Sequence, residues 1–395
     1  MKVLILHQHF NTPEKGGAIR SYYLAKALVD ASIETIVITA HNEKSYKTEI
    51  IEGIEVHYLP IAYNNRFGFA ARSSSFLKYA WGSVRLASKF KGVNYCYAIS
   101  VPLTVGLAAM WIKKRKNIPY IFEVGDLWPD APIQMGFVKN YVFQQMLYAF
   151  EKLIYQSAES VVALSSAIKS AIEKKVPGKT IHMIPNMADT DFYKPELKRP
   201  ELEEKFGVKN KFVVSYIGAI GVANGLDYFI ECANTCRKAE LPIQFIMCGD
   251  GALLDRLKGT AKHLGLRNLS FIDFTNRKGV QEIMNITDAA FVCYKNVPIL
   301  ETGSPNKYFD GLAAGKLIII NFGGWIKKEI EEARCGVYVD PLQPIDFVKK
   351  ISPFIHDQKL LASFQESARA LAEKKYSRTL LSEAFSQLFL AKWSP

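Results

Sequence analysis

Twelve short apolar segments recur along the chain with helix-like stretches between most of them, and this alternation constrains the fold more than any other feature. Six lie before residue 186 and six after residue 211: 2–7, 33–40, 94–100, 119–124, 160–165, 180–185, 212–218, 243–249, 269–274, 289–294, 317–322 and 335–340. Continuous apolar runs of this length are typical of strands buried on both faces of a parallel sheet. The sequence therefore predicts an α/β protein with doubly wound parallel sheets.

A charged stretch with prolines near 190–205 interrupts this alternation, and the pattern then restarts. Such a stretch is typical of a linker between two domains, and 395 residues suffice for two complete cores. We predict an N-terminal domain at 1–190 and a C-terminal domain at 191–378. Because open parallel sheets bind ligands at the carboxyl ends of their strands, we expect the two domains to face each other across a cleft there.

The composition, with 49% apolar and 22% charged residues, excludes a disordered or fibrous chain. Six cysteines lie mostly within apolar runs, so we expect buried, reduced thiols and a cytoplasmic protein. The segment "MKVLILHQHF" begins as a strand and lacks the long apolar region of a cleavable signal. The longest apolar run, 101–112, is too short to cross a bilayer.

Glycine turns follow three of the predicted strands, at Gly16-Gly17, at 218–221 and at 249–251. A phosphate can approach the backbone closely at such turns, although glycine there can also serve the turn alone. None of the three is a G-x-G-x-x-G fingerprint or a Walker loop, which disfavours nicotinamide and ATP chemistry.

The segment "SPNKYFDGLAAGK" at 304–316 places a small polar turn and a lysine directly before a helix rich in small residues. The start of a helix presents unpaired N–H groups and a positive dipole end, which together suit a phosphate. The alternative is an ordinary surface helix whose lysine is solvated.

Five motifs, in the order in which they occur, resemble those of the retaining nucleotide-sugar glycosyltransferases of family 4, in the branch that builds bacterial surface polysaccharides. They are the double glycine after the first strand, "DLWP" at 126–129, "IPNMADTDFYKP" at 184–195, the Gly-Asp-Gly turn at 249–251 and "SPNKYFDGLAAGK" at 304–316. The resemblance implies the GT-B fold, in which two Rossmann-like domains face a cleft. It also implies that the C-terminal domain binds the donor, the N-terminal domain binds the acceptor, and a C-terminal helix, here 379–395, crosses back to the first domain.

The resemblance assigns roles to individual residues. Lys307 would stabilise the charge that develops on the departing diphosphate, and Asp310, one turn further along the helix, would hold ribose hydroxyls. Asp126 is the second catalytic candidate, with a helix N-cap as its alternative role. The residues expected to bind the donor are Gly17, Gly218, Gly221, Gly249, Asp250, Gly251, Arg277, Ser304, Pro305, Asn306, Lys307 and Asp310.

Arg277 would stack on the nucleobase, or else be a solvated loop charge. The chain also departs from the family pattern. The position of the first glutamate of the usual Glu-x7-Glu motif is occupied by Thr302, with Glu301 beside it, and the histidine that many relatives carry before Asp126 is Gly125.

The distribution of charged and aromatic residues indicates the kind of surface on which the acceptor is found. The net charge is +12, and residues 56–122 contain ten basic side chains and no acidic one. Because these cations alternate with aromatic residues and no nucleic-acid motif is present, we expect an anionic membrane surface rather than nucleic acid as partner. Lys78, Arg85 and Lys89 would form the basic side of a helix there, or simply be solvated. His9, at the end of the first strand, either reaches the acceptor or is a satisfied strand-end histidine.

These observations predict a glycosyltransferase at the inner face of the cytoplasmic membrane. It would move a sugar, an N-acetylated hexose or a deoxyhexose, from a UDP-linked donor to a polyprenyl-diphosphate-linked saccharide in O-antigen or capsule synthesis. The seven histidines show no ligand spacing, and neither a metal nor another cofactor is expected. The alternatives are a nucleotide-sugar epimerase or hydrolase on the same fold, and a non-catalytic sugar-nucleotide-binding subunit.

Overall fold

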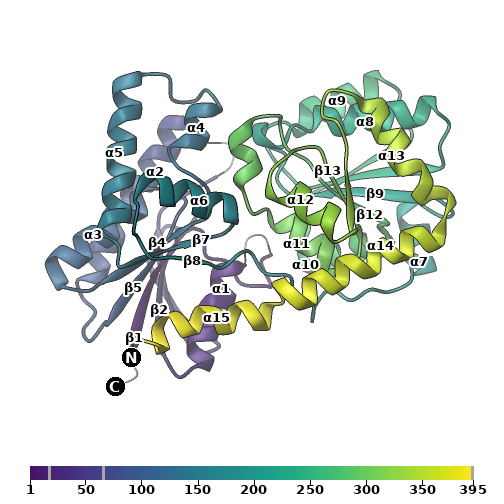
Figure 1. The fold of residues 1–395 in the computed structure, drawn as a ribbon. Coiled ribbons are helices and arrows are strands. Elements are labelled where there is room, and N and C mark those ends of the chain that lie inside the picture. Colours follow the sequence, from purple (N-terminus) through teal and green to yellow (C-terminus); the bar gives the residue numbers. More distant parts are fainter. Residues whose placement is uncertain (17–18, 65–66, 393–395) are drawn as a thin grey trace.

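The computed structural model describes residues 1–16, 19–64 and 67–392, and it contains two α/β domains side by side (Figure 1). The N-terminal sheet has the strand order β3-β4-β2-β1-β5-β6-β7-β8, and the C-terminal sheet the order β11-β10-β9-β12-β13-β14. The N-terminal strands are β1 (Lys2–Leu6), β2 (Glu34–His41), β3 (Lys47–Ile51), β4 (Ile54–Pro60), β5 (Tyr95–Ile99), β6 (Tyr120–Val124), β7 (Ser160–Ala163) and β8 (Ile181–Met183). The C-terminal strands are β9 (Phe212–Ile217), β10 (Ile243–Cys248), β11 (Leu269–Ile272), β12 (Ala289–Val292), β13 (Leu317–Ile320) and β14 (Gly336–Tyr338).

The twelve predicted strands are all present, and they pair in parallel in two doubly wound sheets, which confirms the predicted fold class. The exception is a hairpin that the sequence reading missed. Strand β3 pairs antiparallel with β4 through a tight turn in which Glu52 and Gly53 both have positive φ angles, 47° and 85°. Strand β3 lies at the sheet edge with Ile50 70% exposed, so it lacks the continuous apolar run of a buried strand.

Helices cover both faces of each sheet (Figure 1). Those of the N-terminal domain are α1 (Arg20–Asp30), α2 (Phe69–Ala87), α3 (Thr104–Lys116), α4 (Asp130–Gln134), α5 (Tyr141–Ser157) and α6 (Ser166–Lys175). Those of the C-terminal domain are α7 (Pro200–Phe206), α8 (Asp227–Lys238), α9 (Leu254–His263), α10 (Arg277–Ile286), α11 (Asn306–Ala313), α12 (Trp325–Glu332), α13 (Pro344–His356) and α14 (Gln358–Leu371). Short 3₁₀ turns lie at Val222–Asn224 and Pro298–Thr302, and a π-helical turn lies at Ala372–Tyr376.

Helix α15 (Arg378–Leu390) leaves the C-terminal domain and packs against α1 of the N-terminal domain (Figure 1, yellow). Its Phe385 ring contacts the Tyr97 ring of β5 edge to face, with the ring centroids 4.7 Å apart, and Phe389 contacts Tyr95 in the same manner. These four rings bury the apolar side of α15, so the last helix of the chain belongs to the core of the first domain.

The chain passes from one domain to the other twice, and backbone hydrogen bonds join the two connecting segments. Ala188 donates its N–H to the Tyr376 carbonyl at 2.8 Å, and the Arg378 N–H donates to the Ala188 carbonyl at 3.1 Å. Asp189 beside them is buried and forms ion pairs with Arg277 and, at 3.0 Å, with Arg378. The crossing therefore carries one carboxylate compensated by two guanidinium groups, as a buried charge requires.

All six cysteines are buried and none forms a disulfide, as predicted. No helix among the described residues is both long and apolar enough to cross a bilayer.

Candidate active site

Loops at the carboxyl ends of β6, β9, β10 and β12 meet where the two sheets face each other, and helix α11 begins among them. The helix packs tightly on its own sheet: a Cβ at Gly311 would lie 2.8 Å from Cδ1 of Ile318. Ala313 and Ala314 after it are buried, as predicted for this small-residue helix. Close packing brings the first turn of α11, with Lys307, onto the loop that follows β9.

The Lys307 amine lies between two tyrosine rings. Its Nζ is 4.9 Å from the ring centroid of Tyr216 and 5.3 Å from that of Tyr294. It has no hydrogen bond or ion pair with any of the described residues. Loss of water around the amine lowers the pKa of Lys307 to about 8. Lys307 is therefore not a solvated surface lysine but a cation held between two rings without a direct ion pair, although the Asp310 carboxylate one turn away acts on its charge.

Hydrogen bonds hold both tyrosines beside Lys307, Tyr216 through its hydroxyl and Tyr294 through its backbone. The Tyr216 hydroxyl donates to the Ala219 carbonyl at 2.5 Å. The backbone of Tyr294 is held on both sides by Asn321, whose amide donates to the Tyr294 carbonyl and whose side-chain oxygen accepts from the Tyr294 N–H, each at 2.9 Å. The sequence reading missed these three residues, because only the packing of α11 on the sheet brings them to Lys307.

The predicted glycines form two loops whose backbones touch. A Cβ at Gly249 would lie 1.9 Å from the Gly218 carbonyl oxygen, and one at Gly251 would lie 2.3 Å from that of Ile220. Gly218 has φ +149° and leaves room for Lys307, whose Cε would be 3.2 Å from an added Cβ. Gly218 thus lies directly at the lysine, whereas Gly249 and Gly251 support that loop from behind.

The other glycines of these loops, and the aspartate between them, have surroundings different from those of Gly218. The N–H of Gly221 donates to the Asn224 side chain at 3.2 Å, and Asp250 between the two supporting glycines is exposed. Gly17 lies outside the described residues. Its neighbour Gly16, in the loop after β1, reaches across to the first turn of α10, where an added Cβ would lie 3.6 Å from the Arg277 nitrogen.

Asp310 lies one helical turn beyond Lys307 and faces Arg277 and Tyr193. Burial raises the pKa of Asp310 to about 7, although the cations Arg277 and Lys307 oppose this shift. The structure thus brings together the carboxylate and the lysine that the sequence reading placed in one site. No described residue hydrogen-bonds the Asp310 side chain, so its oxygens can accept bonds from a ligand.

Arg277 is not a solvated loop charge. Its guanidinium pairs with Asp189, donates to the Tyr23 hydroxyl at 3.0 Å and stacks on the Phe192 ring at 3.7 Å. These contacts join α10 to the interdomain crossing, while the electrostatic influence of Arg277 still reaches Asp310.

The turn before α11 is tied to the other domain. The Ser304 hydroxyl accepts from the Asn186 N–H at 3.4 Å, and its carbonyl accepts from the Asn186 amide. Pro305 is buried at the helix start, while Asn306 is exposed beside Lys307. Glu301 turns away from this point, because one of its carboxylate oxygens accepts from the Gly323 N–H at 3.3 Å.

Asp126 enters the site from the N-terminal domain, in the loop between β6 and α4. Its Oδ1 would lie 3.9 Å from a Cβ at Gly303, directly before Ser304, and its charge acts on Tyr294. The residue is partly open to solvent, yet loss of water around the carboxylate raises the pKa of Asp126. Asp126 does not cap α4, which begins at Asp130 without a side-chain cap.

His9 lies in the turn after β1 and packs against the Tyr63 ring of the same domain, with the centroids 4.5 Å apart. Burial lowers its pKa to about 4, so His9 is neutral at physiological pH.

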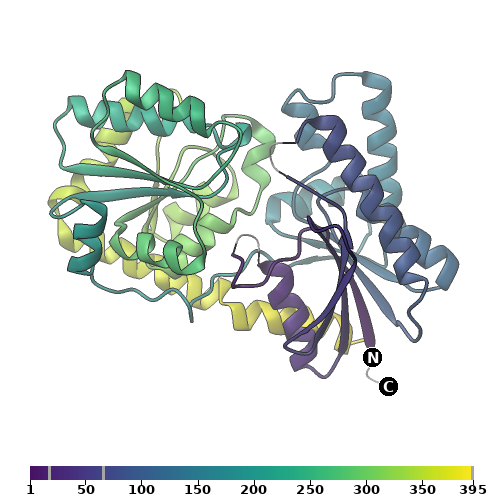
Figure 2. The ribbon, with the colours of Figure 1, turned by 180° about the vertical axis from the view of Figure 1, so that it is seen from behind.

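The predicted basic residues of α2 lie on the outside of the molecule. Lys78 and Arg85 are exposed on the helix, while Tyr79 and Leu86 are buried against the sheet, as the predicted apolar stripe requires. The helix ends at Ala87, so Lys89 lies in the turn beyond it rather than on the helix. Figure 2 shows α2, in dark blue, running along the outside of the N-terminal domain.

Two protein families match the chain, one over each sheet. Residues 15–192 match Glycosyltransferase Family 4, and residues 198–371 match Glycosyl transferases group 1. The chain is 22% identical over 245 residues to alpha-D-kanosaminyltransferase of Streptomyces kanamyceticus, covering 60% of this chain and 61% of that protein. It is 26% identical over 224 residues to the putative colanic acid biosynthesis glycosyl transferase WcaI of Escherichia coli K12, covering 53% and 52%. The matches thus span less than two thirds of either relative.

The fold is shared with solved structures over its whole length. The HepE protein of Anabaena in complex with UDP-glucose superposes with a TM-score of 0.72 at 17% identity, covering 99% of this chain and 100% of that one. Such a likeness at low identity concerns the fold, whereas the two family matches follow one another along the chain as its two sheets do. The chain therefore contains a domain that matches Glycosyltransferase Family 4 followed by one that matches Glycosyl transferases group 1, and the two together have the GT-B fold.

Proposed function

We propose that this protein transfers a sugar from a nucleoside-diphosphate sugar, and that α11 begins at the donor diphosphate. The observation that carries this proposal is the Lys307 amine, which forms no direct ion pair with the described residues and lies between two tyrosine rings beside Gly218. A cation held there is preorganised for charge that develops on a leaving group. The likeness to HepE in its UDP-glucose complex supports UDP as the nucleotide.

Each residue of the site has a part in this proposal. Lys307 and the N–H groups at the start of α11 stabilise the departing diphosphate, and Asp310 accepts hydrogen bonds from the ribose. Asp126 faces this point from the acceptor side and orients the incoming hydroxyl. The family resemblance supports retention of the anomeric configuration, with attack on the face from which the diphosphate departs. No metal ion enters the proposal, because Lys307 supplies the cation.

We propose a lipid-linked saccharide as acceptor, with a polyprenyl diphosphate carrier, in the synthesis of a surface polysaccharide such as O-antigen or capsule. The match to WcaI, a putative enzyme of colanic acid biosynthesis, supports this class of product. The exposed cations of α2 support peripheral attachment to the anionic inner face of the cytoplasmic membrane. The transferred sugar is proposed to be an N-acetylated hexose or a deoxyhexose.

The test incubates the purified chain with UDP- and GDP-sugars, with and without a polyprenyl-diphosphate saccharide, and identifies the products by mass spectrometry. Transfer that requires both substrates, and that Lys307→Ala abolishes, is the expected result. A changed or hydrolysed donor without acceptor would instead indicate an epimerase or hydrolase. Nucleotide binding without any product would indicate a non-catalytic binding subunit.

A further inference from the structure

Helices α2, α3 and α5 form one layer on the outside of the N-terminal domain (Figure 2). Gly106 of α3 lets this helix approach α5, because an added Cβ would lie 2.6 Å from Cδ1 of Ile154. The ends of the helices are tied as well: Lys113 donates to the Ser157 carbonyl at 2.7 Å, and Lys116 donates to the Ser88 carbonyl at 2.8 Å. The layer is therefore a rigid surface rather than three independent helices.

The solvent side of this layer, together with the turn that leads into α5, exposes an unusual amount of apolar surface. We call it the outer face, and its apolar members are Leu77, Trp81, Leu107, Trp111, Phe137, Tyr141, Val142, Phe143, Met146 and Leu153. Trp81 is 73% exposed, Val142 67% and Met146 63%. Large exposed apolar patches on a folded domain mark sites of contact with another apolar surface.

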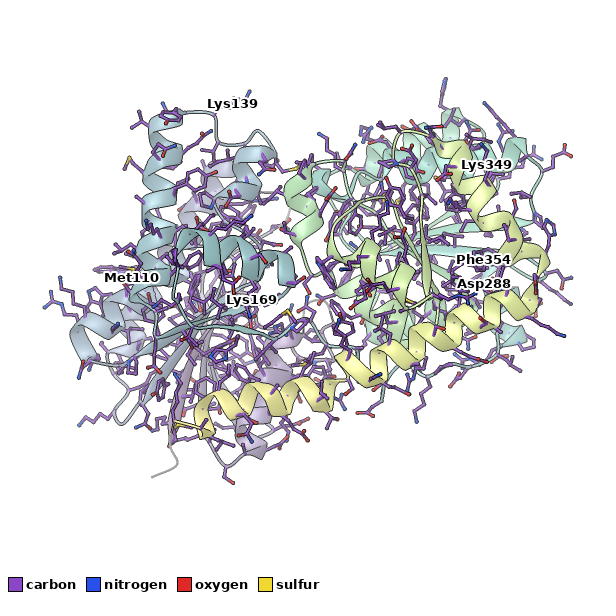
Figure 3. All side chains as sticks on the ribbon, viewed as in Figure 1. Met110, Lys139, Lys169, Asp288, Lys349 and Phe354 are labelled. Atoms are coloured by element: carbon purple, nitrogen blue, oxygen red, sulfur yellow. The ribbon has the colours of Figure 1, made fainter. Side chains whose placement is uncertain are left out.

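The exposed charges that α2, α3 and α5 themselves carry are all positive. The exposed cations of the outer face are Lys78, Arg85, Lys89, Lys91, Lys113, Lys114, Arg115, Lys116, Lys139 and Lys152. Helices α2 and α3 contain no acidic residue, and the one in α5, Glu151, is fully buried and paired with Lys175 at 2.8 Å. Figure 3 shows Lys139 at the outer end of the domain, at the turn before α5.

The exposed apolar patch and its positive charges together indicate which partner binds the outer face. A second copy of the chain would bring like charges together on the same face, which opposes self-association. An anionic bilayer instead offers lipid phosphates to the exposed cations, accepts the apolar side chains among the acyl chains, and places tryptophan and tyrosine at the interface, which they favour.

We propose that the outer face docks on an anionic membrane and that the turn at Phe137 and the first two turns of α5 are inserted into it, while α2 and α3 supply the cations. This inference rests on the proposed function for its purpose, the approach to a lipid-linked acceptor. Helix α4 connects α5 to the candidate active site. It directly follows the loop that contains Asp126, and its Asp130 accepts a hydrogen bond from the Tyr148 hydroxyl of α5 at 3.3 Å. Insertion of α5 therefore sets the height of Asp126 above the membrane.

The buried native cysteines make a direct test possible, because a single cysteine introduced at Met146 can be labelled selectively. We would attach a polarity-sensitive fluorophore to the full-length Met146→Cys variant. Vesicles of phosphatidylcholine with 30% phosphatidylglycerol should shift its emission to the blue, whereas pure phosphatidylcholine should shift it much less. No shift on anionic vesicles would overturn the insertion. A shift that appears without vesicles as protein concentration rises would indicate dimerisation and overturn it too.

Vesicle flotation separates insertion from charge attraction. Val142→Ser combined with Met146→Ser should lower partitioning at least tenfold and should remove the part of the binding that survives high salt, because burial of one large apolar side chain shifts an equilibrium by about tenfold or more. The matched control is Leu197→Ser with Leu342→Ser, two apolar residues of the other domain that are even more exposed than Val142 and Met146, and this variant should bind as wild type does. Equal binding by both double variants would refute the proposal.

The same proteins are assayed for transfer to a short-chain, water-soluble acceptor. Full transfer by the Val142 and Met146 variant, together with lost vesicle binding, is the expected result. Absence of transfer by wild type in this assay would count against the proposed function, while the vesicle results would still decide the outer face.

Discussion

Asp310→Asn tests whether the site is organised for a ligand at the expense of stability. The Asp310 carboxyl has an ordinary pKa of 3.8 in the unfolded chain and about 7 in the folded protein, because burial disfavours its charged form. Between these two values the folded state binds more protons than the unfolded state. The contribution of Asp310 to the free energy of unfolding should therefore fall as pH rises from about 4 to 7 and level off above 7, and the difference between wild type and Asp310→Asn isolates it from other titrating groups.

The magnitude follows from the size of the shift. One pKa unit corresponds to about 1.4 kcal/mol, so the raised pKa costs the folded protein on the order of 4 kcal/mol at pH 8. Asp310→Asn removes the ionisation and keeps the shape. The variant should thus gain stability relative to wild type, by an amount that is small near pH 4 and largest above pH 7.

The assay is urea unfolding at pH 5, 6, 7 and 8, followed by far-UV circular dichroism. Asp255→Asn, which removes an exposed carboxylate of the same domain, controls for the loss of one charge. Nucleotide affinity, measured by calorimetry, should weaken in Asp310→Asn and Asp310→Ala and recover in part in Asp310→Glu, because the carboxylate accepts the ribose hydroxyls. A gain in stability that does not change with pH, or an unchanged affinity for the nucleotide, would refute this reasoning.

Four further predictions concern the lysine, the tyrosine beside it and the membrane. Lys307→Ala should lower turnover about a hundredfold or more, since a lost preorganised contact to developing charge is worth roughly 3 kcal/mol. In wild type the affinity for UDP should decline as pH rises above the lysine pKa of about 8, and calorimetry of the alanine variant should show no such decline. Tyr294→Leu should reduce turnover about three- to thirtyfold, because a cation–π contact is worth roughly 0.5–2 kcal/mol, whereas Tyr294→Phe should stay near wild type in the same kinetic assay. Replacing Lys78, Arg85 and Lys89 together by glutamine should reduce partitioning to anionic vesicles at low salt by about two orders of magnitude, since each cation contributes about 1 kcal/mol, and should leave UDP affinity unchanged in calorimetry. Turnover of the alanine variant at the wild-type rate, equal loss in both Tyr294 variants, or unchanged vesicle binding of the triple variant would contradict the respective prediction.

The strands and the helix at 304–316 were predictable from the sequence because their signals are local. A strand buried on both faces must be apolar at nearly every position, and twelve such runs are visible without knowing what covers them. A helix that packs closely on its sheet must carry small residues, which Gly311, Ala313 and Ala314 confirm. Strands β3 and β4 were both missed. An edge strand such as β3 is not required to be apolar, and in β4 Glu55 and His57 interrupt the apolar run.

The environment of each site residue depended on contacts between segments far apart in the sequence. Nothing near Lys307 indicates that Tyr216 and Tyr294 face its amine, and the commitment of Arg277 to Asp189 appears only where the two domains cross. The outer face, too, depends on contacts between segments far apart in the sequence. The sequence reading identified the cations of α2 from their local density, but Val142 and Met146 are apolar residues of a helix and would ordinarily be assigned to the core. Only the tertiary structure decides which side of a helix is covered, because a helix buries the side that its neighbours reach, and for α5 that side is formed by Glu151, Ile154 and Tyr155.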